Sequence, residues 1–87
     1  MPYLPEETAM LEGLLGAYFT SPHVSESLRR DYGAVRRHIE DGHLDRADYQ
    51  RIRSAVYFLL PLHESSPSEY RLLVGVLTKT SSLLAAQ

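Results

Sequence analysis

The acidic residues between positions 41 and 48 are the first place in this sequence where chemistry could be expected. The segment contains an acid at Asp41, a turn glycine at Gly42 and an aliphatic residue two positions later at Leu44. The second half of a calcium-binding helix–loop–helix has the same order. The first and third ligand positions of such a loop would fall on Arg37 and Ile39, which offer no oxygen. We therefore interpret this segment as a helix end followed by the cap of the next helix.

The four histidines do not have the spacing of a metal site. His38 and His43 are five residues apart and lie on either side of an expected helix end, whereas two metal ligands on one helix face are four apart. The chain has no cysteine, no phosphate-binding glycine loop and no nucleophile elbow. We therefore predict no catalytic residue, no metal, no cofactor and no enzymatic activity.

Basic residues are concentrated between positions 29 and 53, where seven of the nine lysines and arginines lie. Such a surface could bind the phosphates of a nucleic acid. Acidic residues occur in the same stretch at helical contact spacing, for example Glu26 four residues before Arg30, and the whole chain has a net charge of −2. A small nucleic-acid-binding regulator is the alternative function, and the arginines that would contact phosphates are Arg29, Arg36, Arg37 and Arg46.

Helices must position all of these residues, because apolar side chains recur at helical spacing and no strand pattern is visible. Pro5 suits a first helical position, and Ser66, Pro67 and Glu69 are typical of a capping box. Ser21 and Ser25 are competing caps for the second helix, and Gly42 can close it. Asp45 can cap the third helix, with Asp48 completing a capping box. The expected helices lie near residues 5–19, 22–41, 46–60 and 67–85.

The expected fold is all-α, with one domain over residues 1–87 built as a compact bundle of four antiparallel amphipathic helices. Short connections favour antiparallel neighbours, and 87 residues leave no room for a second domain. No apolar run approaches the roughly 20 residues of a membrane span. The first residues do not resemble a secretory signal, so we expect no membrane association and a cytoplasmic location.

The third and fourth helices carry more apolar residues than one buried stripe needs. This excess predicts association, because apolar surface left exposed on a small domain usually marks an interface. We therefore predict a homodimer and a small interaction or regulatory module that also binds an unidentified protein partner. A short, cysteine-free helical chain of mixed charge is typical of bacterial or phage accessory proteins. The expected interface consists of Tyr57, Phe58, Leu72, Leu73, Val76 and Leu77.

Overall fold

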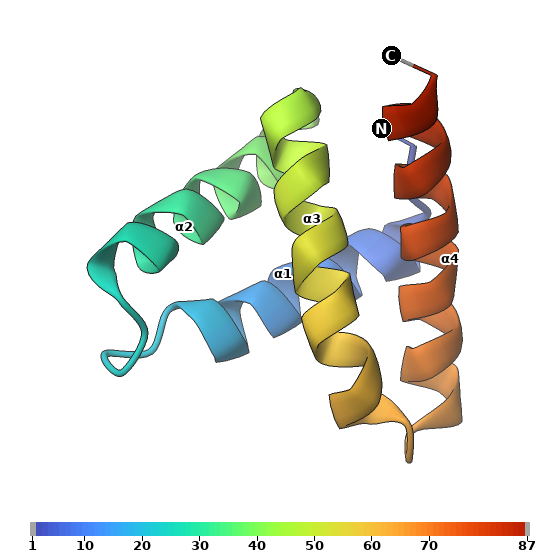
Figure 1. Cartoon of the computed structure of the whole chain (residues 1–87), viewed down its shortest axis with the longest axis horizontal. Helices are drawn as coiled ribbons and strands as arrows, with labels where there is room; N and C mark the ends of the chain where they lie inside the picture. Colours follow the sequence, from blue (N-terminus) through green and yellow to red (C-terminus); the bar gives the residue numbers. More distant parts are fainter. Residues whose placement is uncertain (1, 87) are drawn as a thin grey trace.

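The computed structural model describes residues 2–86, which form four α-helices and no strand (Figure 1). The all-α prediction is therefore confirmed. A single 3-10 turn, η1, follows the third helix. The elements in chain order are α1 (Pro5–Phe19), α2 (Glu26–Asp41), α3 (Arg46–Leu59), η1 (Leu60–His63) and α4 (Pro67–Ala85).

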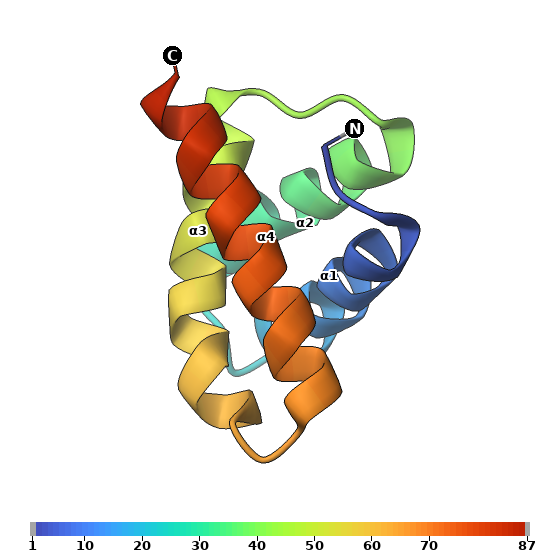
Figure 2. The same cartoon turned by 90° about the vertical axis from the view of Figure 1, so that its right-hand side faces the viewer.

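The helices are arranged as two hairpins that cross each other. α3 and α4 lie side by side and run in opposite directions, and α1 and α2 form the second pair (Figures 1 and 2). α1 passes behind the α3–α4 pair, so the four helices do not share one axis. Because of this crossing, α4 packs against α1 as well as against α3. No helix within residues 2–86 is both long enough and apolar enough to cross a membrane.

The bounds of α1 and α4 agree with those expected, and the other two helices differ at one end. α2 begins at Glu26 and not at residue 22, because Ser25 is the cap that is used: its Oγ accepts a hydrogen bond from the Leu28 N–H at 3.3 Å. Residues 21–24 form a turn instead, closed by the Val24 N–H on the Ser21 carbonyl. α3 ends at Leu59, and Pro61 lies within η1 rather than just after the helix.

One of the two predicted capping boxes forms. The Asp48 N–H donates to Asp45 Oδ1 at 2.9 Å, and the Asp45 N–H donates to Asp48 Oδ2 at 3.0 Å. The bond from the Asp48 N–H also holds the pKa of the Asp45 carboxyl below its usual range. Gly42 closes α2 in the left-handed conformation, with φ of 76°. At α4, by contrast, the Ser66 side chain caps nothing, and Glu69 lies against His63.

The hydrophobic core lies where the two hairpins cross. Every α-helix contributes fully or nearly fully buried side chains to it, and Tyr3 adds one from the segment before α1. The Tyr3 hydroxyl is 2.6 Å from Thr80 Oγ1, which itself donates to the Val76 carbonyl, so Tyr3 is the donor. Burial raises the pKa of Tyr3 to about 12. The core residues in the helices are Leu11, Leu15, Tyr32, Val35, Ile39, Tyr49, Ile52, Ala55, Val56, Leu59, Leu73, Val76 and Leu84.

A buried ion pair joins α1 to α4. Glu7 is 3% exposed, and its Oε1 accepts hydrogen bonds from Lys79 Nζ at 2.6 Å and from the Leu4 N–H at 2.8 Å. Its Oε2 lies over Gly75, where an added Cβ would be only 2.7 Å away. The absence of a side chain at Gly75 therefore allows the close approach of the Glu7 carboxylate.

We expect Gly75→Ala to lower the free energy of unfolding by about 1 kcal/mol, although alanine has the higher helix propensity. The new methyl group must push the Glu7 carboxylate away from Lys79 and the Leu4 N–H. Gly13→Ala in α1 is the matched control, because an added Cβ there meets nothing within 4 Å. This variant should gain about 0.5 to 1 kcal/mol. Urea unfolding measures both changes, and equal gains in the two variants would show that Glu7 moves aside freely.

Candidate protein-interaction surface

The six residues of the expected interface do not lie on one surface. Tyr57 and Phe58 are exposed, at 60% and 52%. Leu72 and Leu77 are half-buried, and Leu77 packs against the core. Leu73 and Val76 are completely buried inside the chain, so we correct the interface by removing these two. They are buried because the crossing of the hairpins places α4 against both α3 and α1.

Tyr57 lies on the side of α3 that borders α4. Arg46, Arg53 and Tyr57 are spaced seven and four residues apart, so they share one side of α3. Arg46 reaches α4, where its Nη1 donates to the Leu84 carbonyl at 3.3 Å. Tyr57 is eleven residues after Arg46 in α3. Leu73, next to Val74, is eleven residues before Leu84 in α4, which runs in the opposite direction. Tyr57 is therefore level with the exposed Val74.

Phe58, the next residue along α3, points about 100° away from Tyr57 around the helix axis, toward α1 and α2. Arg51, one heptad before Phe58, shares this side, and the Arg51 carbonyl accepts a hydrogen bond from the Tyr32 hydroxyl of α2 at 3.2 Å. Phe58 itself contacts α1, with ring centroids 6.1 Å from Tyr18 and 5.9 Å from Phe19. The exposed side of α3 thus has an aromatic ring on each flank.

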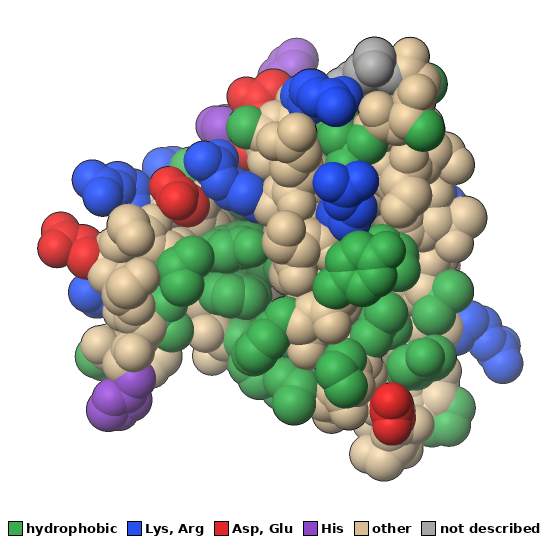
Figure 3. All heavy atoms as spheres, viewed as in Figure 1, with side chains coloured by type: hydrophobic (Ala, Val, Ile, Leu, Met, Phe, Trp, Pro, Cys, Tyr) green, Lys and Arg blue, Asp and Glu red, His purple; other side chains and the backbone are tan. Residues whose placement is uncertain are grey.

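An apolar surface extends from α2 across α3 to α4. Figure 3 shows hydrophobic side chains gathered over the C-terminal half of α3 and continuing toward both neighbouring helices. We call this surface the apolar face. It consists of six large side chains that are each more than one third exposed: Leu28, Tyr57, Phe58, Leu62, Tyr70 and Val74.

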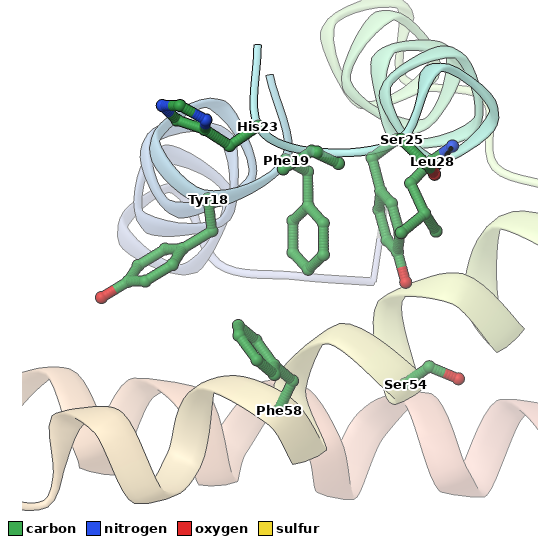
Figure 4. A pocket seen from close by; sticks show the side chains of 9 residues that line it. Tyr18, Phe19, His23, Ser25, Leu28, Ser54 and Phe58 are labelled. Atoms are coloured by element: carbon green, nitrogen blue, oxygen red, sulfur yellow. Dashed lines mark hydrogen bonds between the residues drawn. The ribbon is translucent and has the colours of Figure 1, made fainter. Parts of the chain in front are cut away.

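A pocket of about 420 Å³ opens at one edge of the apolar face, between α1, α2 and α3, where Leu28 and Phe58 line it. Figure 4 shows Phe19 and Leu28 on one side of this pocket and Phe58 facing them from α3. Phe19 is stacked on Tyr32, with ring centroids 4.1 Å apart and an angle of 22° between the rings. Because the Tyr32 hydroxyl is bonded to the Arg51 carbonyl, its ring presents mainly carbon to the pocket. Burial raises the pKa of Tyr32.

A chain of side-chain contacts holds η1, and with it Leu62, in place. His63 Nδ1 is 2.8 Å from Glu69 Oε2 of α4, and His63 Nε2 is 3.4 Å from the Tyr18 hydroxyl of α1. The rings of Tyr18 and His63 also meet edge to face. These contacts join three elements at the edge of the apolar face, so that Leu62 is presented from a fixed segment.

His38 makes a contact that stabilises the junction between α2 and α3. His38 Nδ1 of α2 is 2.7 Å from Asp48 Oδ2 of α3, and Asp48 is almost completely buried. The same oxygen accepts the Asp45 N–H, so the contact links the end of α2 to the cap of α3. Among residues 2–86, no three histidine, aspartate or glutamate side chains come together in a way that would hold a metal ion.

The four arginines of the alternative nucleic-acid surface have different surroundings. Arg29 and Arg37 are exposed on α2. The Arg36 guanidinium packs over Gly16 of α1, 3.2 Å from where a Cβ would be, and Arg46 donates to the Leu84 carbonyl. Arg36 and Arg46 therefore make contacts within the chain, whereas Arg29 and Arg37 are exposed on α2.

Four members of the apolar face, namely Leu28, Leu62, Tyr70 and Val74, are missing from the interface expected from sequence. Leu28, Tyr70 and Val74 occur at core spacing in their helices, so periodicity assigns them to the interior. Leu62 follows Pro61 outside any helical pattern. The signal that could have found Leu28 is its place in the first turn of α2, beyond the reach of the crossing helices.

Comparison with known proteins finds no matching family model, no similar curated protein and no similar solved structure.

Proposed function

We propose that this chain is a small protein-interaction module that binds protein through its apolar face. The observation that carries this proposal is the exposure of the six large hydrophobic side chains of the apolar face on a chain of 87 residues, together with the gathering of hydrophobic side chains over α3 in Figure 3. Contiguous apolar patches on small soluble domains mark interaction sites, because exposing them to water is unfavourable. The proposal gives the module a regulatory or adaptor role in the cytoplasm, without catalytic activity of its own.

The composition and support of the apolar face favour this role. Three of its six residues are aromatic, and aromatic side chains are enriched at the centres of protein interfaces. The face is built on α3, whose Ile52, Val56 and Leu59 are completely buried. A rigid support of this kind lowers the entropy lost on binding. The pocket beside Phe58 could accept one bulky side chain of the partner.

The experiment that tests this proposal compares two variants that each replace an exposed hydrophobic residue with aspartate. Tyr57→Asp changes the centre of the apolar face, and Leu4→Asp changes a residue of similar exposure at the start of α1. Tagged proteins are used for affinity capture from lysate of the producing cell, with and without nuclease, and bound proteins are quantified by mass spectrometry.

We expect the unmodified chain and Leu4→Asp to retain the same protein after nuclease, and Tyr57→Asp to retain roughly tenfold less, as for a central interface residue. Circular dichroism should show that both variants remain folded. Equal capture by Tyr57→Asp and the unmodified chain would contradict the proposal. Capture that disappears with nuclease would instead support the alternative, nucleic-acid binding through Arg29, Arg36, Arg37 and Arg46.

A further inference from the structure

Charges of opposite sign lie before and after Tyr57 and Phe58 along the chain. Arg46 is the first residue of α3 and Arg53 lies in its middle, Tyr57 and Phe58 follow, and Glu64 comes directly after η1. In Figure 3, basic side chains lie over the upper, N-terminal part of α3, and an acidic side chain lies near the turn between α3 and α4. The apolar face is thus bordered by a positive end and a negative end.

Arg53 and Glu64 have no ion-pair partner within residues 2–86. They cannot pair with each other in one chain, because eleven residues of helix separate them by roughly 16 Å or more. Glu64 is exposed and Arg53 is half-exposed beside Tyr57. Both charges are therefore available to a partner that covers the apolar face.

The midpoint between Arg53 and Glu64 falls between Phe58 of the apolar face and the buried Leu59 beneath it. In a two-fold symmetric dimer, if residue i contacts residue j of the partner, then j also contacts i. Two antiparallel copies of α3 that cross at this midpoint would pair Arg53 of each copy with Glu64 of the other. A parallel pairing in the same register would place Arg53 opposite Arg53, which like-charge repulsion disfavours.

From this order of charges we infer that the occupant of the apolar face is a second copy of this chain, packed across a two-fold axis with the two α3 helices antiparallel. Tyr57 and Phe58 of both copies meet near the axis, and two Arg53–Glu64 ion pairs border them. In this register the small, exposed Ser54 is level with His63 of the other copy, next to Leu62. The inference rests on the proposed function and names its partner.

The size of the surface fits a stable dimer. The molecule measures 32 × 32 × 21 Å, and the apolar face lies on the broad side that is seen along the shortest axis (Figure 3). A standard interface of about 800 Å² per partner would cover about a sixth of the 5135 Å² accessible surface. The broad side is large enough to provide this area.

Exchange of the two charges tests the arrangement. Arg53→Glu alone and Glu64→Arg alone each place like charges opposite one another at both symmetric contacts, and we expect each to weaken the dimer roughly tenfold. The double variant Arg53→Glu/Glu64→Arg restores both pairs and should dimerise like the unmodified chain. Arg30→Glu, a charge reversal at an exposed residue of α2 outside the apolar face, is the matched control. Sedimentation velocity over a dilution series at low salt measures the dissociation constants.

Restoration by the double variant is specific to contact between two copies, since the exchanged residues are too far apart to pair within one chain. A monomer at every concentration would overturn the inference, as would single variants that dimerise normally or a double variant that stays dissociated. If the chain is monomeric but Tyr57→Asp still loses captured protein, the proposed function stands with a different partner. If the chain is monomeric and Tyr57→Asp captures protein normally, both proposals fail.

Discussion

Replacing Leu73 with alanine is expected to lower the free energy of unfolding by about 3 to 4 kcal/mol. Leu73 is completely buried at the crossing of the hairpins, where α4 meets α1 and α3. The substitution removes the transfer free energy of the side chain and leaves a cavity that close-packed neighbours fill only in part. A chain of this length has a total stability of roughly 4 to 13 kcal/mol, so the variant should melt at a much lower temperature.

Leu62→Ala is the control for this prediction, because it makes the same chemical change on the apolar face. Leu62 is 51% exposed, and its truncation should cost about 0.5 kcal/mol or less in the monomer. Chemical denaturation at low protein concentration compares the two variants. If Leu73→Ala were no more costly than Leu62→Ala, Leu73 would not belong to the core, and the interface expected from sequence would have to include it again.

Replacing Lys79 with methionine is expected to cost about 2 to 3 kcal/mol, because it leaves the Glu7 carboxylate buried without its cation. The loss of stability would be larger for a fully buried ion pair. Because the Lys79 side chain is 36% exposed, water can reach the site and solvate part of the Glu7 charge in the variant. The Leu4 N–H still donates to Glu7 Oε1 in the variant. Thermal or urea unfolding near neutral pH measures the loss.

A double-mutant cycle separates the ion pair from the packing of the two side chains. Glu7→Gln/Lys79→Met removes both charges, and we expect it to be at least 1 kcal/mol more stable than Lys79→Met alone. The glutamine oxygen can still accept from the Leu4 N–H. A loss below about 0.5 kcal/mol for Lys79→Met would mean that the pair behaves like an exposed surface salt bridge.

The helix ends that could be predicted from sequence are those with a single local signal. Pro5 and Pro67 stand at first helical positions, and both helices begin there. The start of α2 could not be predicted, since Ser21 and Ser25 are both good caps and only the folded turn at residues 21–24 decides between them. The capping box expected at Ser66 and Glu69 does not form, because the Glu69 carboxylate contacts His63 instead. Helical spacing does not predict this contact, since His63 lies in η1, outside α4.

The exposed surface could be predicted only in part, because it depends on how the hairpins cross. Tyr57 and Phe58 were predicted to be accessible from the apolar surplus of α3. In α4, however, Leu73, Val74, Val76 and Leu77 are all apolar, so the sequence alone does not show which of them face inward. The packing of α4 against both α3 and α1 buries Leu73 and Val76 and leaves Val74 exposed.

The hydrogen bond between Tyr3 and Thr80 has a consequence for how the domain comes apart. It joins residues 77 positions apart in sequence, while most other packing lies within each hairpin. Either hairpin can form from local contacts, but this contact of high sequence separation can form only once α1 and α4 are both in place. The segment before α1 and the part of α4 around Thr80 therefore stabilise each other, and we expect the domain to open as one cooperative unit rather than unravel from either end.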